Sequence, residues 1–352
     1  MSGPVTMLDQ QRDRQRPGEA YPPYEPSTAP LLPAFGWRHL LDLDDFSAAD
    51  ISAVLQMAAR MRDRLAPPTR RLSTLQGRTL VNLFYENTTR TRVSFELAAK
   101  RLGADVVNVT ASGSSVTKGE SLIDTVRTLQ ALGADIVVMR HSQSGAPDLV
   151  ARHIDGAVIN AGDGWHAHPS QALLDLFTMQ EQLGDLAGRR VTLIGDILHS
   201  RVARSNLWAL TAVGAEVVLC GPPTLMPQRV AELVAARPTP NGSPRRIRVE
   251  YRVERALEGA DVVMVLRLQR ERQAAGLLPS LREYTAHYGL TAARLALAKC
   301  GALVMHPGPM NEGVEIDPEV AHGAASVIER QVTNGVAVRM AILALLTQAR
   351  SW

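Results

Sequence analysis

The sequence predicts an α/β protein built from two doubly wound parallel-sheet domains that are linked by helices. Its 352 residues correspond to two domains at ~150 residues each. Short apolar runs alternate with helix-length segments along most of the chain. Because these runs are continuous rather than alternating with polar residues, they are typical of parallel strands that helices cover on both faces.

The elements follow one another in a regular order. Residues 1–35 contain seven prolines and no hydrophobic periodicity, which predicts a disordered tail or, as the alternative, a docking segment for a partner chain. A helix is predicted from Phe46, with Ser47 or Asp50 as its N-cap. Further helices are predicted over 169–183 and 326–346, and we expect the last one to return to the first domain. The predicted strands are 79–84, 105–109, 136–140, 157–160, 191–194, 216–220, 247–251, 261–265 and 302–305.

The composition is that of an ordinary globular protein, with 45% hydrophobic and 21% charged residues. No apolar run approaches the ~18 residues of a membrane span, and two cysteines are too few for a disulfide scaffold. The first residues lack the pattern of a signal peptide, so we expect a cytoplasmic protein. The net charge of +3 is small and dispersed, and aromatic residues are only 4%, which argues against a nucleic-acid partner.

Hydroxyl and basic side chains alternate directly after the first predicted strand, from Thr88 to Arg92, where a helix begins. A helix start offers free backbone N–H groups, to which this segment adds hydroxyl donors and two guanidinium charges. The combination indicates an anion site, most plausibly for phosphate. The alternative is that Thr88 or Thr89 is a plain N-cap beside solvated arginines, but it does not explain three hydroxyls interleaved with two arginines.

The segment from Thr88 to Arg92 resembles the Ser-Thr-Arg-Thr-Arg motif with which transcarbamylases bind carbamoyl phosphate. Thr88 stands where that family usually has Ser, which keeps the hydroxyl donor. From about Trp37 to Leu346 the chain resembles the catalytic chains of the aspartate carbamoyltransferases. The resemblance implies a carbamoyl-phosphate-binding domain, 36–170 plus 326–352, and an aspartate-binding domain, 171–325.

A glycine-flanked, hydroxyl-rich loop from Ser112 to Glu120 contains Lys118, one of only three lysines. By itself such a loop is often no more than a flexible connection. The resemblance implies that Ser114 and Lys118 reach into the active site of a neighbouring subunit, and hence a homotrimer with shared sites.

Three further positions, Arg140, His168 and Gln171, match the family. Arg140 ends a predicted strand, where ligands of open sheets gather, although it could equally be a surface charge. The spacing of His166 and His168 is only a weak zinc signal, because no Cys or carboxylate triad lies near them in the sequence. The resemblance implies instead that Arg140 contacts the carbamoyl oxygen and phosphate, that His168 bonds the carbamoyl carbonyl, and that Gln171 contacts the carbamoyl nitrogen.

The second domain lacks Gly-x-Gly-x-x-Gly and a Walker lysine after its first strand, which argues against a nucleotide site. The resemblance implies that Arg201, Arg267 and Gln269 bind aspartate. A solvated basic loop is the alternative for 267–272, but two separated arginines suit a dicarboxylate. The resemblance also implies a turn with a cis proline at Pro307, Gly308 and Pro309, whose carbonyls orient the substrates. Glu312 departs from the Arg that is frequent in the family at this position.

The resemblance implies transfer of the carbamoyl group of carbamoyl phosphate to the α-amine of L-aspartate, in pyrimidine biosynthesis. It implies no cofactor and no metal, with Arg90, Thr91, Arg140 and His168 as catalytic residues. Phosphate would be held by Thr88, Thr89, Arg90, Ser114 and Lys118, and aspartate also by Lys118. The sequence shows no obvious base for the amine proton, which in the family goes to the departing phosphate.

Three alternatives remain at this stage: an ornithine carbamoyltransferase, an enzyme for another amino acid, and a catalytically silent assembly subunit. Ornithine is disfavoured because arginines would repel its ammonium group. The Pro-rich tail and the segment from Gly162 to Pro169 resemble members of the family that associate with a dihydroorotase-like chain.

Overall fold

The computed structural model describes residues 35–64, 71–86, 88–110, 120–269 and 276–348. Within these residues the strands form a four-stranded and a five-stranded sheet, and neighbouring strands run parallel in both. The predicted fold class is confirmed. The predicted tail, Ser114 and Lys118 lie outside the described residues, apart from Phe35 at the end of the tail.

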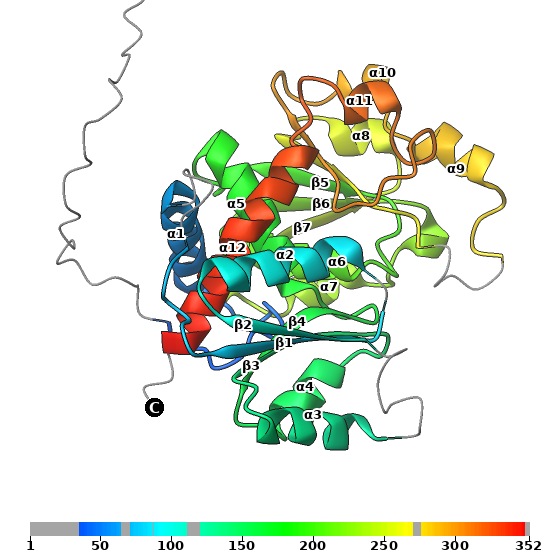
Figure 1. The fold of residues 1–352 in the computed structure, drawn as a ribbon. Coiled ribbons are helices and arrows are strands. Elements are labelled where there is room, and N and C mark those ends of the chain that lie inside the picture. Colours follow the sequence, from blue (N-terminus) through cyan, green and yellow to red (C-terminus); the bar gives the residue numbers. More distant parts are fainter. Residues whose placement is uncertain (1–34, 65–70, 87, 111–119, 270–275, 349–352) are drawn as a thin grey trace, which may run out of the picture. The chain divides into compact units, whose positions relative to one another are not determined.

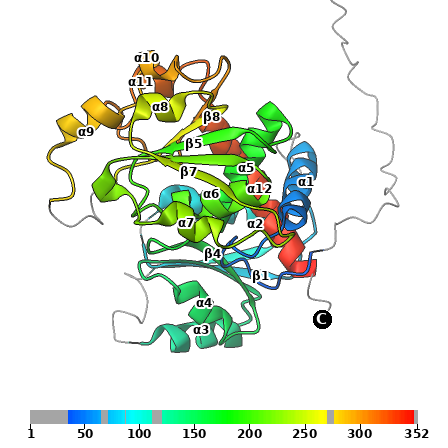
Figure 2. The ribbon, with the colours of Figure 1, turned by 180° about the vertical axis from the view of Figure 1, so that it is seen from behind.

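The first sheet has the strand order β2–β1–β3–β4. Helix α2 (Thr89–Arg101) packs on β1 and β2, whereas α3 (Leu122–Ala131) and α4 (Ala146–Ala151) lie on the opposite face (Figures 1 and 2). Since Phe84 pairs with Arg140, the loops after β1 and β3 leave the sheet side by side. The strands are β1 (Thr79–Phe84), β2 (Asp105–Thr110), β3 (Ile136–His141) and β4 (Ala157–Asp163).

Strand β2 departs from the prediction that the strands are buried on both faces. It is the edge strand of its sheet, and Val107 is 46% exposed there. The apolar run at 105–109 therefore predicted the strand correctly but not its position at the edge of the sheet. The burial of a strand depends on its neighbours in the fold, which the run itself does not specify.

The second sheet has the order β7–β6–β5–β8–β9, so that the chain leaves β5 toward one side and returns through β8 on the other. Such switch points are where open α/β sheets bind ligands. Its strands are β5 (Arg190–Ile194), β6 (Glu216–Cys220), β7 (Arg246–Glu250), β8 (Val262–Val265) and β9 (Leu303–Met305). Its helices are α6 (Arg201–Ala212), η3 (Pro223–Leu225), α7 (Val230–Ala235), α8 (Val253–Leu257), α9 (Leu281–Tyr288), α10 (Ala292–Leu295) and α11 (Pro318–Ala321).

Helix α12 (Ile328–Gln348) follows the second sheet but packs against α1 (Ala48–Arg64), α2 and α5 (Pro169–Leu183), as Figure 1 shows. The predicted return of the last helix is thus observed. Helix α1 starts at the predicted cap, where Ser47 Oγ accepts the Asp50 N–H bond (3.1 Å) and the Asp50 carboxylate accepts the Ser47 N–H bond (2.9 Å). Among the described helices, none is long and apolar enough to cross a bilayer.

Candidate active site

The loops that follow strands of both sheets line one cavity of about 860 Å³. They come from the ends of β1, β3, β4, β5, β8 and β9, and α12 closes one wall. Predicted site residues from both halves of the sequence therefore line the same cavity. The predicted residues that line it are Thr88, Thr89, Arg90, Thr91, Arg140, His168, Gln171, Arg201, Arg267, Gln269, Pro307, Gly308 and Pro309.

The cavity is strongly basic. Among its described lining residues, five arginines face a single carboxylate, that of Glu86. A concave surface of one sign concentrates its field and attracts ligands of the opposite charge. The cavity is thus suited to small anions rather than to an ammonium group. The five arginines are Arg90, Arg140, Arg201, Arg267 and Arg339.

Three helices, α2, α5 and α6, begin at the cavity, so that their N-terminal N–H groups add positive partial charge to it. The first turn of α2 has no acidic residue and includes Arg90, an arrangement that the helix dipole disfavours unless an anion binds there. In the part of this turn that the structure describes, the Thr88 hydroxyl makes no capping bond to the helix. This observation goes against the plain N-cap alternative and leaves the hydroxyl available to a ligand.

Glu86 joins the two halves of the site, a role that the sequence reasoning missed. Its Oε2 accepts a hydrogen bond from Arg140 Nε (3.0 Å) and another from Arg201 Nη2 (2.7 Å). Arg140 is the penultimate residue of β3 in the first sheet, whereas Arg201 begins α6 in the second half of the chain. One carboxylate therefore orients an arginine from each half toward the same space. The only available signal was its place two residues before the Thr88 motif.

Arg201 is buried, with 4% of its surface exposed, although it lies at the first position of α6, where a cation opposes the helix dipole. Besides Glu86, the Gly164 carbonyl accepts a bond from its Nη1 (3.4 Å). Gly162 has φ +117°, and a Cβ atom there would lie 2.9 Å from the guanidinium carbon. The end of β4 thus needs glycine at 162 to fit against Arg201.

Arg90 and Arg267 both line the cavity and lie close enough for their charges to interact. Burial lowers the pKa of Arg90, and the nearby charge of Arg267 lowers it further. An anion between these arginines would relieve their repulsion. Gly308 lies against the Arg90 guanidinium, and the Gly308–Pro309 peptide is cis, as the resemblance implied.

We expect Gly308→Ala to weaken anion binding at the start of α2. Gly308 has φ +64°, and an added Cβ would collide with the Arg90 guanidinium. Arg90 must then move away from the first turn of α2, which should raise the Kd for inorganic phosphate by about tenfold or more. Titration calorimetry with inorganic phosphate measures this effect. The matched control is Gly145→Ala, whose Cβ would meet open space at a similarly positive φ of 82°; an equal Kd in the two variants would contradict the prediction.

A buried polar cluster fixes the wall behind His168 and Gln171. The Asp175 carboxylate accepts bonds from Gln171 Nε2 (2.9 Å), Gln331 Nε2 (2.7 Å) and Asn206 Nδ2 (2.8 Å). Burial raises the pKa of Asp175 to about 6, although the three amides and the nearby Arg339 charge oppose the shift. The cluster ties α5, α6 and α12 together beneath the cavity.

Comparison with known proteins gives two adjoining matches. Residues 38–181 match the family model of the aspartate/ornithine carbamoyltransferase carbamoyl-P binding domain, and residues 187–346 match that of the Asp/Orn binding domain. The aspartate carbamoyltransferase catalytic subunit of Chloroflexus aurantiacus is 61% identical over 306 residues, which is 87% of this chain and 97% of that protein. The chain belongs to the aspartate/ornithine carbamoyltransferase family.

Solved structures of this carbamoyltransferase family have the same fold. Aspartate transcarbamoylase from Trypanosoma cruzi, crystallised with carbamoyl aspartate and phosphate, superposes with a TM-score of 0.79 at 34% identity, covering 91% of this chain and 99% of that one. Ornithine carbamoyltransferase from Pyrococcus furiosus superposes with a TM-score of 0.78 at 28% identity, covering 88% and 97%. The fold is thus common to both branches of the carbamoyltransferases, and the choice of amino acid depends on the side chains of the site.

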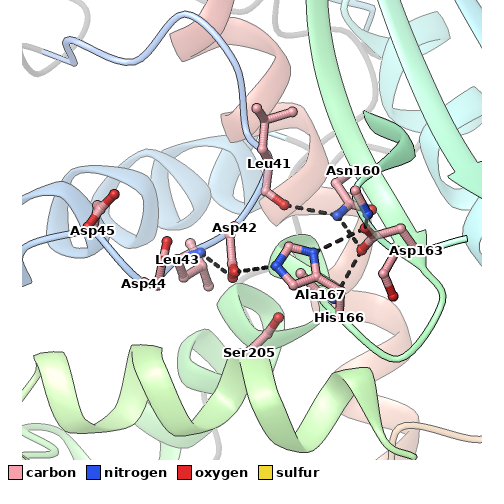
Figure 3. A network of polar contacts seen from close by, with 12 residues as sticks. Leu41, Asp42, Leu43, Asp44, Asp45, Asn160, Asp163, His166, Ala167 and Ser205 are labelled. Atoms are coloured by element: carbon pink, nitrogen blue, oxygen red, sulfur yellow. Dashed lines mark hydrogen bonds and ion pairs between the residues drawn. The ribbon is translucent and has the colours of Figure 1, made fainter. Parts of the chain in front are cut away.

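The two histidines of the loop before α5 have different surroundings. His168 lies in the cavity wall, and its backbone N–H donates to Ser205 Oγ (2.8 Å). The His166 ring lies between two carboxylates, Asp163 Oδ2 (3.0 Å from Nδ1) and Asp42 Oδ2 (3.1 Å from Nε2), as Figure 3 shows. In the described ranges no group of three or more His, Cys, Asp or Glu side chains is arranged to hold a metal ion.

The remaining predicted features take these positions. Glu312 forms an ion pair with His322 (3.2 Å) and is not one of the cavity residues described above. Trp165, to which the sequence assigned no role, lines the cavity and packs edge-on against His199, with 4.6 Å between ring centroids. Ser94, Gln331 and Arg339 also line the cavity and were missed, because helix positions give no sequence signal of which face meets a ligand.

We expect the stability that His166 contributes to disappear at alkaline pH. Hydrogen bonds with Asp163 and Asp42 raise the pKa of His166 from 6.5 to about 10. Since the folded-state pKa is the higher one, the stabilisation is complete below pH 6.5 and is lost as the pH rises to about 10. Thermal unfolding of the wild type and His166→Gln, measured from pH 6 to 10.5, should show a difference in Tm that shrinks across this window. A constant difference would contradict the prediction.

Proposed function

We propose that the chain transfers the carbamoyl group of carbamoyl phosphate to the α-amine of L-aspartate, giving N-carbamoyl-L-aspartate and phosphate. The observation that carries the proposal is the single cavity in which the Thr88–Thr91 segment meets Arg201 and Arg267. The Thr88–Thr91 segment offers a site for the phosphate group, and Arg201 and Arg267 offer two cations for a second anion in the same cavity. The names of the relatives, and the Trypanosoma cruzi structure with carbamoyl aspartate and phosphate, support the same reaction.

In the proposed reaction the chain supplies position and charge. Thr88, Thr89 and Arg90 hold the phosphate group at the start of α2, while Gln171 contacts the carbamoyl nitrogen. Thr91, Arg140 and His168 polarise the carbamoyl carbonyl and stabilise the oxyanion that forms when the amine nitrogen attacks its carbon. The bond from that carbon to the phosphate oxygen then breaks, and the departing phosphate accepts the amine proton.

Aspartate is held from the other side of the cavity. Arg201 and Arg267 each bind one carboxylate, and Gln269 assists them. The carbonyls of the turn from Pro307 to Pro309 orient the incoming amine. Two arginines at this side of the cavity, of which Arg201 is buried, favour a dicarboxylate over ornithine, whose side-chain ammonium they would repel.

The test is to incubate the purified protein with carbamoyl phosphate and either L-aspartate or L-ornithine and to quantify the carbamoylated product. We expect carbamoyl-aspartate and little citrulline. Phosphate release without carbamoyl-aspartate would overturn the proposed function, and citrulline as the main product would establish the ornithine alternative. Absence of product with both amino acids would support the silent assembly subunit.

We propose further that the protein is a cytoplasmic homotrimer in pyrimidine biosynthesis, with Ser114 and Lys118 of one subunit completing the site of the next. Two inactive variants, Lys118→Ala and Arg140→Ala, test this arrangement. Reassembled mixtures should regain activity, because some sites then combine an intact Lys118 with an intact Arg140. Mixtures no more active than either parent would refute shared sites. Co-purification with a dihydroorotase-like chain tests the remaining predicted partner.

A further inference from the structure

The end of β4 and the loop that follows it, from Gly162 to His168, are fixed by one charged network (Figure 3). Asp163 is fully buried, and its carboxylate accepts N–H bonds from Gly145 (2.7 Å) and Ala167 (3.0 Å) and a bond from Asn160 Nδ2 (2.8 Å). Both ring nitrogens of His166 face carboxylates, and carboxylates can only accept hydrogen bonds when ionised. Both nitrogens must therefore carry a proton, so that the ring is a cation.

The charged groups that face this cation come from two elements. Asp163 belongs to β4, and Asp42 belongs to the segment before α1. The Asp42 segment is itself held against β4, because the Asn160 N–H donates to the Leu40 carbonyl (2.8 Å) and Asn160 Nδ2 donates to the Leu41 carbonyl (2.9 Å). Helix α6 presents a neutral group to the loop, the hydroxyl of Ser205. The ring thus links the loop that follows β4 to a segment that is itself bound to β4.

The residues on either side of His166 are those that meet the cavity. The Gly164 carbonyl accepts a bond from Arg201, Trp165 lines the cavity, and His168 follows two positions later. The path of this loop therefore sets where a carbonyl-polarising and a carboxylate-binding side chain lie.

We propose that His166, as an imidazolium clamped between Asp42 and Asp163, is a positioning residue that holds the loop before α5 so that His168 and Arg201 face the substrates. The inference rests on the proposed function and deepens it. His166 itself is not one of the residues described as lining the cavity, so it acts through the loop rather than on the reacting atoms.

The first experiment replaces the cation with a neutral side chain, in the variant His166→Gln. A glutamine amide can donate to one carboxylate but must turn its oxygen toward the other, so the bridge is lost. We expect this variant to lower kcat by about tenfold to a hundredfold, with a much smaller change in the KM for carbamoyl phosphate. The matched control is His287→Gln, an exposed histidine of α9, which should keep wild-type kinetics. Wild-type kcat in His166→Gln would overturn the proposal.

The second experiment has a readout that a merely structural role would not move. In Asp42→Asn the ring loses one anion, which should lower its pKa by about one unit or more. The kcat of this variant should then fall at a lower alkaline pH than that of the wild type. The double variant Asp42→Asn/His166→Gln has no imidazole at 166 and should lose that additional fall. A kcat profile that is the same in the single and double variants would refute the clamp.

The third measurement does not depend on activity and separates failure of this inference from failure of the proposed function. Trp165 adjoins His166, and its fluorescence is isolated by difference against Trp165→Phe. Acrylamide quenching of Trp165 should increase in His166→Gln and not in His287→Gln. If the wild type makes no carbamoyl-aspartate, the proposed function fails, whereas unchanged quenching and kcat in His166→Gln refute the positioning role.

Discussion

Replacing Arg140 by methionine is expected to lower kcat for carbamoyl-aspartate formation by roughly a hundredfold to a thousandfold, the usual effect of removing one preorganised oxyanion donor. Arg140 is the penultimate residue of β3 and lines the cavity, and the Glu86 carboxylate accepts a hydrogen bond from its Nε (3.0 Å). Methionine keeps an unbranched apolar stem but supplies no charge to the carbamoyl oxygen. Product formation at saturating carbamoyl phosphate and aspartate measures the loss.

The control for this prediction is Arg152→Met. Arg152 lies in the same half of the chain but is exposed, and it forms an ion pair with Asp148 one turn away (2.8 Å). Such surface pairs contribute little, so both activity and Tm should stay near wild type. An Arg140→Met enzyme that retained most of its kcat would show that carbonyl polarisation does not depend on this arginine.

The second large effect is expected on stability, from Asp175→Ala. The substitution removes the acceptor of three buried amides, on Gln171, Gln331 and Asn206, and an anion close to the buried guanidinium of Arg339. Breaking a buried charge pair typically costs about 3–5 kcal/mol, because the remaining charge stays buried without compensation. Urea denaturation should show a loss of this size in the free energy of unfolding, together with lower activity, since Gln171 loses its support.

Two control variants accompany Asp175→Ala, one a milder substitution at the same position and the other the loss of an exposed carboxylate. Asp175→Asn keeps one acceptor oxygen and should destabilise less than Ala. Asp148→Ala removes an exposed carboxylate and should leave the urea midpoint almost unchanged. If Asp175→Ala and Asp148→Ala had the same midpoint, the cluster beneath the cavity would not be what holds α5, α6 and α12 together.

The sequence predicted those features that depend on neighbouring residues within one element, and it missed those that depend on contacts between distant elements. The strand at 79–84 and the helix start at Thr88–Arg92 are local: a continuous apolar run and a hydroxyl–arginine alternation carry their own signals. The pairing of Arg140 and Arg201 through Glu86 is not local, because Glu86 and Arg201 are 115 positions apart. No pattern within one element indicates such a contact, since it depends on how two sheets are placed.

The same limit applies to Arg339 and His166. Arg339 lies in the largely apolar helix α12, whose periodicity indicates burial but not that this position reaches the cavity. His166 and His168 are two residues apart, and the sequence offered both as a weak metal pair. Only the path of the loop shows that one lines the cavity and the other faces Asp42 and Asp163.

The packing of α12 has a consequence for how the protein is made. The ribosome synthesises α1, α2 and α5 early, but the helix that buries their apolar surfaces, with Leu343, Leu345 and Leu346 fully covered, emerges only after the second sheet. The first half of a nascent chain therefore carries an open apolar groove throughout synthesis of the second. Its folding must finish after translation has passed residue 348, and a chain that stops before Ile328 would be a substrate for chaperones rather than a smaller stable domain.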